Sequence, residues 1–259
     1  MGHIRLGILP QTRKWREVID LLGIPSSPAQ IADATSAAAE KGIEFAKYDT
    51  GVSNVVYLFI RAIWDAKQAN FTDDVTIADR AGAEGSTLTD FVANFNNALE
   101  EKLAKLGKIS DLAEMARYSG VETLTELCKQ ETKSLFGVSS NDAKQSLGKW
   151  ATPQKFGYVG QTFFAKFLYR FLDYHLSREI PSHIGPDKSF SNISKCAEFK
   201  KALELHCYQT ARIAKECSGC WPNAAQFREG ITIENVKTQF LPCALARISD
   251  ELRLRRNAK

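Results

Sequence analysis

Apolar residues recur along most of the chain at intervals of three and four, the spacing that places them on one face of an α-helix. No segment shows the convincing alternation of a half-buried strand. The most apolar segment, 51–68, has a stripe formed by Val52, Val55, Val56, Phe59 and Ile63. Further apolar residues widen this stripe until the helix is apolar nearly all round: Leu58, Ile60 and Trp64. We therefore expect this helix at the centre of the fold.

Polar residues mark where helices begin. Ser27 and Gln30 form a capping-box pattern, with Pro28 at the first helical position, and Thr87 with Asp90 forms another capping pair. Ser139 and Asp142 predict a short helix. The remaining predicted helices are those ending at Gly107, Gly120 and Gly137, two long ones at about 161–179 and 194–216, and a last helix or Pro242-kinked pair over 232–256.

These signals predict an all-α fold, a bundle of roughly nine helices. Segment 71–86 breaks the helical pattern with Gly, Asp and Ser and is expected to be a loop or hinge. It suggests two lobes, an N-terminal helical lobe over 1–80 and a C-terminal helical bundle over 81–259. The alternative is one continuous domain.

The composition is that of an ordinary soluble domain, with 44% hydrophobic and 25% charged residues in 259. A net charge of +4 is too small to require a nucleic-acid partner. The N-terminal segment lacks the continuous apolar core of a secretory signal, and the most apolar window is too short and polar to span a bilayer. Six cysteines fit reduced thiols of the cytosol. We expect a cytoplasmic protein without membrane contact.

One candidate site is Arg170 and His175, near the end of the 161–179 helix. His175 follows Arg170 by five positions, and an Arg followed by a His at such a spacing resembles the motif of HEPN-type ribonucleases. The resemblance implies acid–base chemistry for His175 and stabilisation of the charge on phosphorus by Arg170. However, Phe171 stands where that family often has a polar residue. The alternative is a structural histidine, because His175 continues the apolar stripe of its helix.

A second pair, Arg178 and His183, repeats the interval but crosses Pro181, so it belongs to a loop. Together with Lys188 it could contact a ligand or partner. Basic residues also cluster near both ends of the sequence: Arg13, Lys14 and Arg16, and then Arg253, Arg255 and Arg256. Solubilising surfaces are the simpler interpretation, and contact with nucleic acid or a partner is the alternative.

The third candidate is a cysteine cluster: His206, Cys217, Cys220 and Cys243. The "CSGC" segment supplies two thiols at the spacing that holds one zinc ion, and His206 with Cys243 could complete a tetrahedral set. Small apolar core residues and a redox dithiol are the alternatives. The position of Cys217 argues against a redox dithiol, because Cys217 is expected to lie at the end of a helix and redox dithiols usually lie at the beginning of one.

Segments "TRKWREVIDLLG" and "LSREIPSHIG" resemble uncharacterised all-helical bacterial proteins, some encoded beside antiphage-defence genes. The sequence contains no glycine-rich phosphate loop, nucleophile elbow or zinc-protease motif. The prediction is therefore a non-enzymatic helical interaction subunit of a cytosolic bacterial complex, in defence or nucleic-acid processing, that needs no cofactor. It would bind a protein partner, or a second copy of itself, and it could also contact nucleic acid. A HEPN-like metal-independent ribonuclease and a zinc-stabilised nucleic-acid-binding protein remain the alternatives.

Overall fold

The computed structural model describes residues 9–67, 87–107, 109–132, 138–186, 188–228 and 230–257. Within these ranges the chain is built from helices and contains no strand, only two isolated bridges. The predicted all-α class is therefore confirmed. The predicted loop at 71–86 lies outside the described residues. None of the described helices is apolar over a length that could cross a bilayer.

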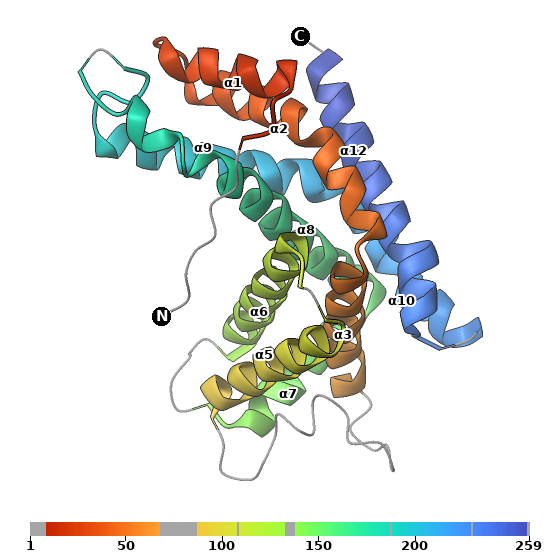
Figure 1. The fold of residues 1–259 in the computed structure, drawn as a ribbon. Helices are drawn as coiled ribbons and strands as arrows, with labels where there is room; N and C mark the ends of the chain where they lie inside the picture. Colours follow the sequence, from red (N-terminus) through yellow and green to blue (C-terminus); the bar gives the residue numbers. More distant parts are fainter. Residues whose placement is uncertain are drawn as a thin grey trace.

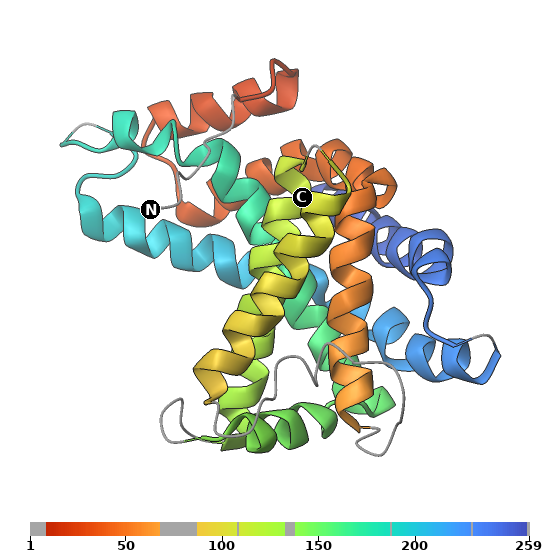
Figure 2. The same ribbon diagram turned by 60° about the horizontal axis from the view of Figure 1, so that its bottom comes forward.

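The helices form two groups joined by a long central helix (Figure 1). The upper group in that view contains α1 (Arg13–Gly23), α2 (Pro28–Phe45), α9 (Ile193–Thr210) and α12 (Leu241–Asn257). The lower group contains α3 (Thr50–Lys67), α5 (Leu88–Lys105), α6 (Asp111–Thr132) and α7 (Ser140–Gly148), and α7 crosses the ends of the other three (Figure 2). The central helix, α8 (Pro153–Leu176), contacts α6, α9 and α10 (Ala214–Arg228).

Short helical segments connect these elements: η1 (Ala46–Tyr48), η2 (Ile180–His183), η3 (Ala211–Ile213), α11 (Ile233–Asn235) and η4 (Val236–Phe240). The last two precede α12, which has Pro242 in its first turn. Helical hydrogen bonding continues across this junction, because the backbone N–H of Leu241 donates to the carbonyl oxygen of Val236 in η4.

The predicted caps are present. The hydroxyl of Ser27 accepts a hydrogen bond from the backbone N–H of Gln30, and the Gln30 side chain accepts one from the N–H of Ser27. Thr87 and Asp90 do the same at the start of α5. Ser139 caps α7. Each cap satisfies backbone donors that a helix leaves unpaired at its first turn.

The predicted central helix is α3, whose apolar stripe and widening residues are buried except for the half-buried Leu58. The buried residues form one continuous core that includes Trp15, Phe59, Phe163 and Leu245. Helices from both sides of residue 80 contribute to it, as α2 packs on α12 and α3 on α6. The division into two lobes stays a prediction.

Two sequence-based boundaries are wrong. Gly120 does not end a helix, because α6 continues through it and this glycine lies buried beside Phe59 and Phe163. The predicted 194–216 helix is interrupted by η3, and a new helix, α10, begins at Ala214. Cys217 therefore lies in the first turn of a helix and not at the end of one. The break lies where Ala211 and Ala214 are fully buried.

Small residues let α10 approach α8 closely. A Cβ atom added at Gly160 would overlap the side chain of Ser218, and one added at Gly219 would meet the carbonyl oxygen of Pro153. No larger residue fits at either position without movement of the helices. This close crossing fixes the position of α10, and with it Cys217.

Candidate functional site

A groove of about 460 Å³ lies over α8, between α6 and α9. We call it the α6–α8–α9 groove. Its lining residues come from the three helices: Glu122, Glu126, Thr162, Ala165, Lys166, Tyr169, Arg170, Lys201, Glu204, Leu205 and Tyr208. Its volume lies within the range of ordinary ligand sites in proteins.

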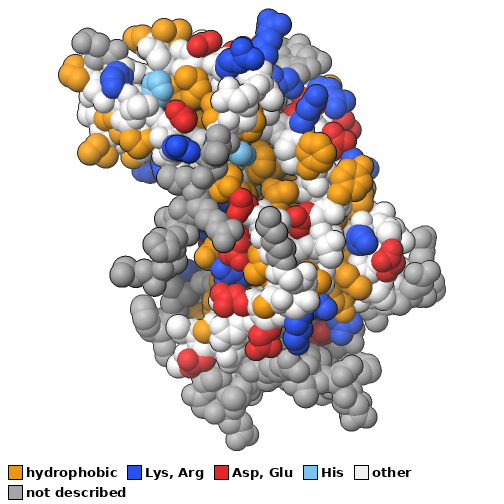
Figure 3. Space-filling model, in the orientation of Figure 1, with side chains coloured by type: hydrophobic (Ala, Val, Ile, Leu, Met, Phe, Trp, Pro, Cys, Tyr) orange, Lys and Arg blue, Asp and Glu red, His pale blue; other side chains and the backbone are white. Residues whose placement is uncertain are grey.

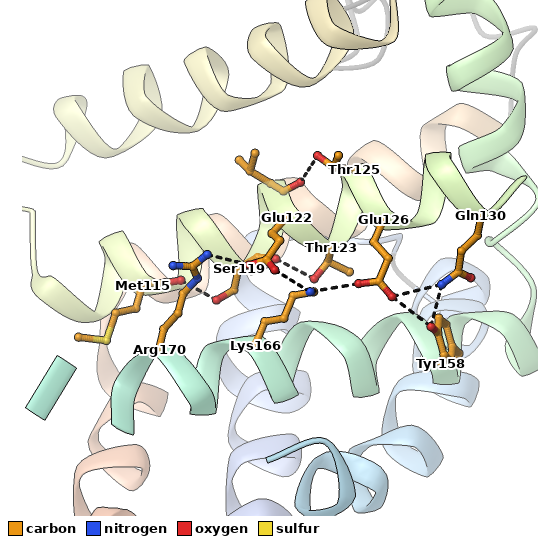
Figure 4. A network of polar contacts seen from close by, with 11 residues as sticks. Met115, Ser119, Glu122, Thr123, Thr125, Glu126, Gln130, Tyr158, Lys166 and Arg170 are labelled. Carbon is orange, nitrogen blue, oxygen red and sulfur yellow. Dashed lines mark hydrogen bonds and ion pairs between the residues drawn. The ribbon is translucent and has the colours of Figure 1, made fainter. Parts of the chain in front are cut away.

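Ion pairs hold one wall of the groove in place (Figure 4). Arg170 Nη2 lies 2.7 Å from Glu122 Oε2, and Lys166 Nζ lies 2.8 Å from Glu122 Oε1 and 3.1 Å from Glu126 Oε2. Glu126 Oε1 also accepts hydrogen bonds from Gln130 Nε2 at 3.2 Å and from the Tyr158 hydroxyl at 3.3 Å. The acidic and basic residues follow one another at the spacing of one helical turn, so α6 and α8 are joined along their length.

These contacts stabilise the charged forms. Burial alone would raise the pKa of Glu122, but hydrogen bonds from Lys166 and Arg170 outweigh it and the pKa is lowered. Burial would lower the pKa of Lys166, and its two carboxylate partners raise it instead. Burial, reinforced by nearby Asp173, raises the pKa of Tyr169 to about 12. The raised pKa makes ionisation of the Tyr169 phenol still less favourable than that of an exposed tyrosine.

Two buried polar atoms lie at the groove without a hydrogen-bond partner: the hydroxyl of Thr162 and Nε of Arg170. Thr162 is only 3% exposed. A buried donor without a partner destabilises a protein unless water or a ligand supplies one. The base of the groove thus has unused hydrogen-bonding capacity.

Arg170 and His175 have different surroundings. Arg170 pairs with Glu122 and lies over the ring of Tyr118, with its guanidinium carbon 5.5 Å from the ring centre. The His175 ring packs against three aromatic rings, those of Trp15 at 5.2 Å, Phe171 at 5.0 Å and Tyr174 at 5.1 Å between centroids. The described contacts do not join the two side chains, and His175 connects α8 to α1.

The residues of the zinc hypothesis lie in separate places. Cys217 Sγ and Cys243 Sγ are 3.0 Å apart, between α10 and α12. His206 Nδ1 lies 3.4 Å from Asp33 Oδ1, between α9 and α2, and Cys220 is exposed. Among the described residues, no three His, Cys, Asp or Glu side chains gather as a metal site would require. The fold thus pairs two of the four residues and leaves His206 with another partner.

The two basic clusters meet on one buried carboxylate. Glu40 accepts hydrogen bonds from Lys14 Nζ and Arg253 Nε, each 2.9 Å long. Arg13 and Arg16 are also exposed on α1. Lys and Arg side chains gather on this part of the surface, where α1 and the end of α12 lie (Figure 3). We call Arg13, Lys14, Arg16 and Arg253 the basic face; Arg255 and Arg256 lie further along α12, and their side chains are outside the described structure.

The loop candidates lie beside α1. Arg178 is exposed just after α8, and His183 ends η2. The ammonium of Lys188 donates a hydrogen bond to the carbonyl oxygen of Ser182, and the neighbouring Ser189 hydroxyl donates to backbone carbonyls at the end of α1. These contacts fasten the loop to α1, and they bring none of the three candidate side chains into the α6–α8–α9 groove.

The sequence reasoning missed most of the groove. The one available signal was spacing, because Glu122 and Glu126 stand four residues apart on one helix and Lys166 and Arg170 four apart on another. Nothing in the sequence indicated that these two pairs face each other. Comparison of the chain with protein-family models, curated proteins and solved structures finds no match.

Proposed function

We propose that this chain is a non-enzymatic helical interaction subunit that binds a protein partner in the α6–α8–α9 groove. The observation that carries the proposal is the groove itself, a wall of fixed ion pairs opposite exposed apolar side chains. Leu205 is 57% exposed and Tyr208 36% exposed on the α9 side. Tyr118, against which Arg170 lies, is 46% exposed on α6.

The residue types support a protein partner. Protein interfaces are enriched in Tyr and Arg, and truncation of these residues commonly weakens binding most. The groove contains Arg170 and the two tyrosines Tyr169 and Tyr208. Arg170 is already oriented by Glu122, so little side-chain entropy is lost when a partner binds.

The charges of the groove favour a polypeptide over a polyanion. Three lining residues are basic (Lys166, Arg170 and Lys201) and three are acidic (Glu122, Glu126 and Glu204). Lys166 and Arg170 are neutralised by Glu122 and Glu126. Nucleic-acid phosphates would meet carboxylates here, whereas a peptide that presents both charges and an apolar anchor complements the surface.

The surroundings of Arg170 and His175 supply no argument for catalysis. A general acid–base histidine must reach the atom whose proton it transfers. His175 lies among three aromatic rings on the α1 side, while Arg170 faces the groove and pairs with Glu122. The ribonuclease hypothesis is therefore not the function that the geometry supports best.

The proposal is tested by capture from a lysate of the source cells with three matched baits: the wild type, Leu205→Glu, and Phe45→Glu. Phe45 is 67% exposed on α2, outside the groove, and so controls for the added charge. We expect the wild type and Phe45→Glu to capture at least one polypeptide in equal amounts. The amount of that polypeptide recovered with Leu205→Glu should be at least tenfold lower. Equal recovery with all three baits would contradict the proposal. Sedimentation of the purified wild type distinguishes a second copy of this chain from a different partner.

The basic face favours a second candidate function, contact with nucleic acid. Lys14 and Arg253 share the carboxylate of Glu40, and Arg253 also lies 3.5 Å from Asp250. The exposed cations that would meet phosphates are therefore Arg13 and Arg16 of α1. Grouped cations increase affinity for phosphates because each releases condensed counterions from the nucleic acid. This surface is separate from the groove, so a protein partner and a nucleic acid would not compete.

A further inference from the structure

Two cysteines far apart in the sequence meet where α10 packs against α12. Cys217 Sγ and Cys243 Sγ are 3.0 Å apart, and 26 residues separate them along the chain. A disulfide bond is about 2.05 Å long, so the sulfurs need to approach by only about 1 Å to bond. Cys217 and Cys243 are therefore close enough to form a disulfide after a small movement of their side chains.

We propose that Cys217 and Cys243 form a reversible disulfide by exchange with a small-molecule disulfide such as oxidised glutathione. The pair is a modification site distinct from the α6–α8–α9 groove, and the inference does not depend on the proposed function. The adjacent "CSGC" cysteine, Cys220, is outside the pair.

The two thiols have different roles because their exposure differs. Cys243 is exposed, and the guanidinium of Arg247, one turn further along α12, faces it. The same guanidinium also acts on Cys217, so the roles of the two thiols follow from their difference in exposure. Arg247 also pairs with Glu216 at 3.3 Å, which holds the guanidinium beside the cysteines. Cys243 is therefore the thiol that meets the oxidant first.

Cys217 is the resolving thiol. It is partly buried, and burial together with the neighbouring Cys243 raises its pKa to about 12. A thiol of such high pKa reacts slowly with a reagent in solution. Its contact with Cys243 offsets this low reactivity, because two groups fixed in contact react as though each were present at a very high concentration.

The exchange balances in two steps. The Cys243 thiolate attacks one sulfur of oxidised glutathione, the glutathione S–S bond breaks, and the released glutathione takes up the proton that Cys243 lost. The Cys217 thiolate then attacks Cys243 Sγ in the mixed disulfide and expels a second glutathione, which takes up the proton of Cys217. Two protein thiols are oxidised by two electrons, and one glutathione disulfide is reduced to two thiols.

The bond would join the beginning of α10 to α12 and close a loop containing α11 and η4. Closing a loop of 26 residues removes conformational entropy from the unfolded chain. For a protein of this size we expect the melting temperature to rise by roughly 5–10 °C on oxidation and to return on reduction with dithiothreitol.

The experiment uses the full chain carrying Cys220→Ser, so that the third accessible thiol does not react. After incubation with oxidised glutathione, we expect intact-mass spectrometry to show the loss of two hydrogens without a glutathione adduct. Peptide mapping should link Cys217 to Cys243 within one chain. With Cys217→Ser added, a glutathione adduct should instead accumulate on Cys243 at least tenfold above its level in the parent. The unoxidised Cys220→Ser chain provides the melting reference.

Two outcomes would overturn the inference. One is a stable glutathione adduct on Cys243 while Cys217 is present, which would mean that the resolving step does not occur. The other is a Cys217–Cys220 link in the oxidised wild type, which would assign the reaction to the "CSGC" segment. The wild-type peptide map needs no substitution, so it remains decisive even if a serine variant fails to fold.

Discussion

Arg253 of α12 donates a hydrogen bond of 2.9 Å to Glu40 of α2, a residue 213 positions earlier in the chain. The other oxygen of Glu40 accepts one from Lys14 of α1. Its side chain is only 9% exposed, whereas those of Lys14 and Arg253 are 37% and 50% exposed. One buried carboxylate thus connects three helices and carries two cations on the surface.

We expect Glu40→Gln to destabilise the protein by about 1–2 kcal/mol at pH 7. The amide keeps the shape of the side chain but loses two charge-assisted hydrogen bonds, and the freed cations return partly to water. Urea unfolding followed by circular dichroism measures the change. Glu44→Gln is the matched control, because Glu44 pairs with Lys47 on the surface. Equal effects of the two substitutions would mean that burial of Glu40 is unimportant.

The effect of Glu40→Gln should depend on pH. Burial acts to raise the pKa of Glu40, but the hydrogen bonds from Lys14 and Arg253 prevail and the pKa falls below its ordinary value of 4.5. A lowered folded-state pKa means that ionised Glu40 stabilises the fold above about pH 4.5, and this contribution is lost as the pH falls through the folded-state value. The stability difference between wild type and Glu40→Gln should therefore be largest near neutral pH and shrink below pH 4.5. A constant difference across this range would contradict the assignment.

At the α8–α10 crossing, we expect Gly160→Ala to cost about 1–3 kcal/mol. The added methyl group would overlap the Ser218 side chain, and α10 packs too closely on α8 to yield without strain. Gly23→Ala is the control, because nothing lies within 4 Å of a Cβ atom at that position. It should remain within about 1 kcal/mol of the wild type, since alanine is the better helix former. Thermal melting of both variants checks the contrast.

For His175→Ala, we expect loss of stability without any change in ribonuclease activity. Removal of the ring takes away contacts with Trp15, Phe171 and Tyr174 and loosens α1, at a cost of about 1–3 kcal/mol. A fluorescence-quenched RNA should be cleaved no faster by wild type than by this variant. Cleavage by wild type that His175→Ala abolishes, with its helical circular dichroism intact, would establish the ribonuclease instead.

The elements of the fold were predictable where their signals are local. Ser27 and Gln30 lie within one turn of each other, so their cap is readable from the sequence alone. The helix end predicted at Gly120 was wrong because residues distant in the sequence determine the role of this glycine. Phe59 and Phe163 pack against it and favour a small residue inside a continuous helix. The start of α10 was missed for the same reason, since the packing of α8 decides it.

The candidate sites were less predictable because each is assembled from separate segments. Glu122 and Arg170 are 48 residues apart, and only the packing of α6 on α8 brings them together. The cysteines show the difference clearly. The sequence favoured the close pair Cys217 and Cys220, whereas the fold places Cys217 against Cys243. Sequence spacing measures proximity within a helix and contains no information on which helices pack together.

The basic face provides the last prediction, which concerns nucleic acid. If phosphates bind there, replacing both Arg13 and Arg16 by Ala should weaken binding of a short DNA duplex and reduce the dependence of log K on log salt concentration by roughly one unit per cation removed. Lys102→Ala with Lys105→Ala removes the same charge from α5, in the other group of helices. That control should bind nearly as the wild type does, because the two exposed lysines lie far from the basic face. Equal weakening by both double variants would show that net charge alone attracts the duplex. Salt titrations by fluorescence anisotropy separate the two outcomes, because a localised contact changes the slope only for the α1 variant.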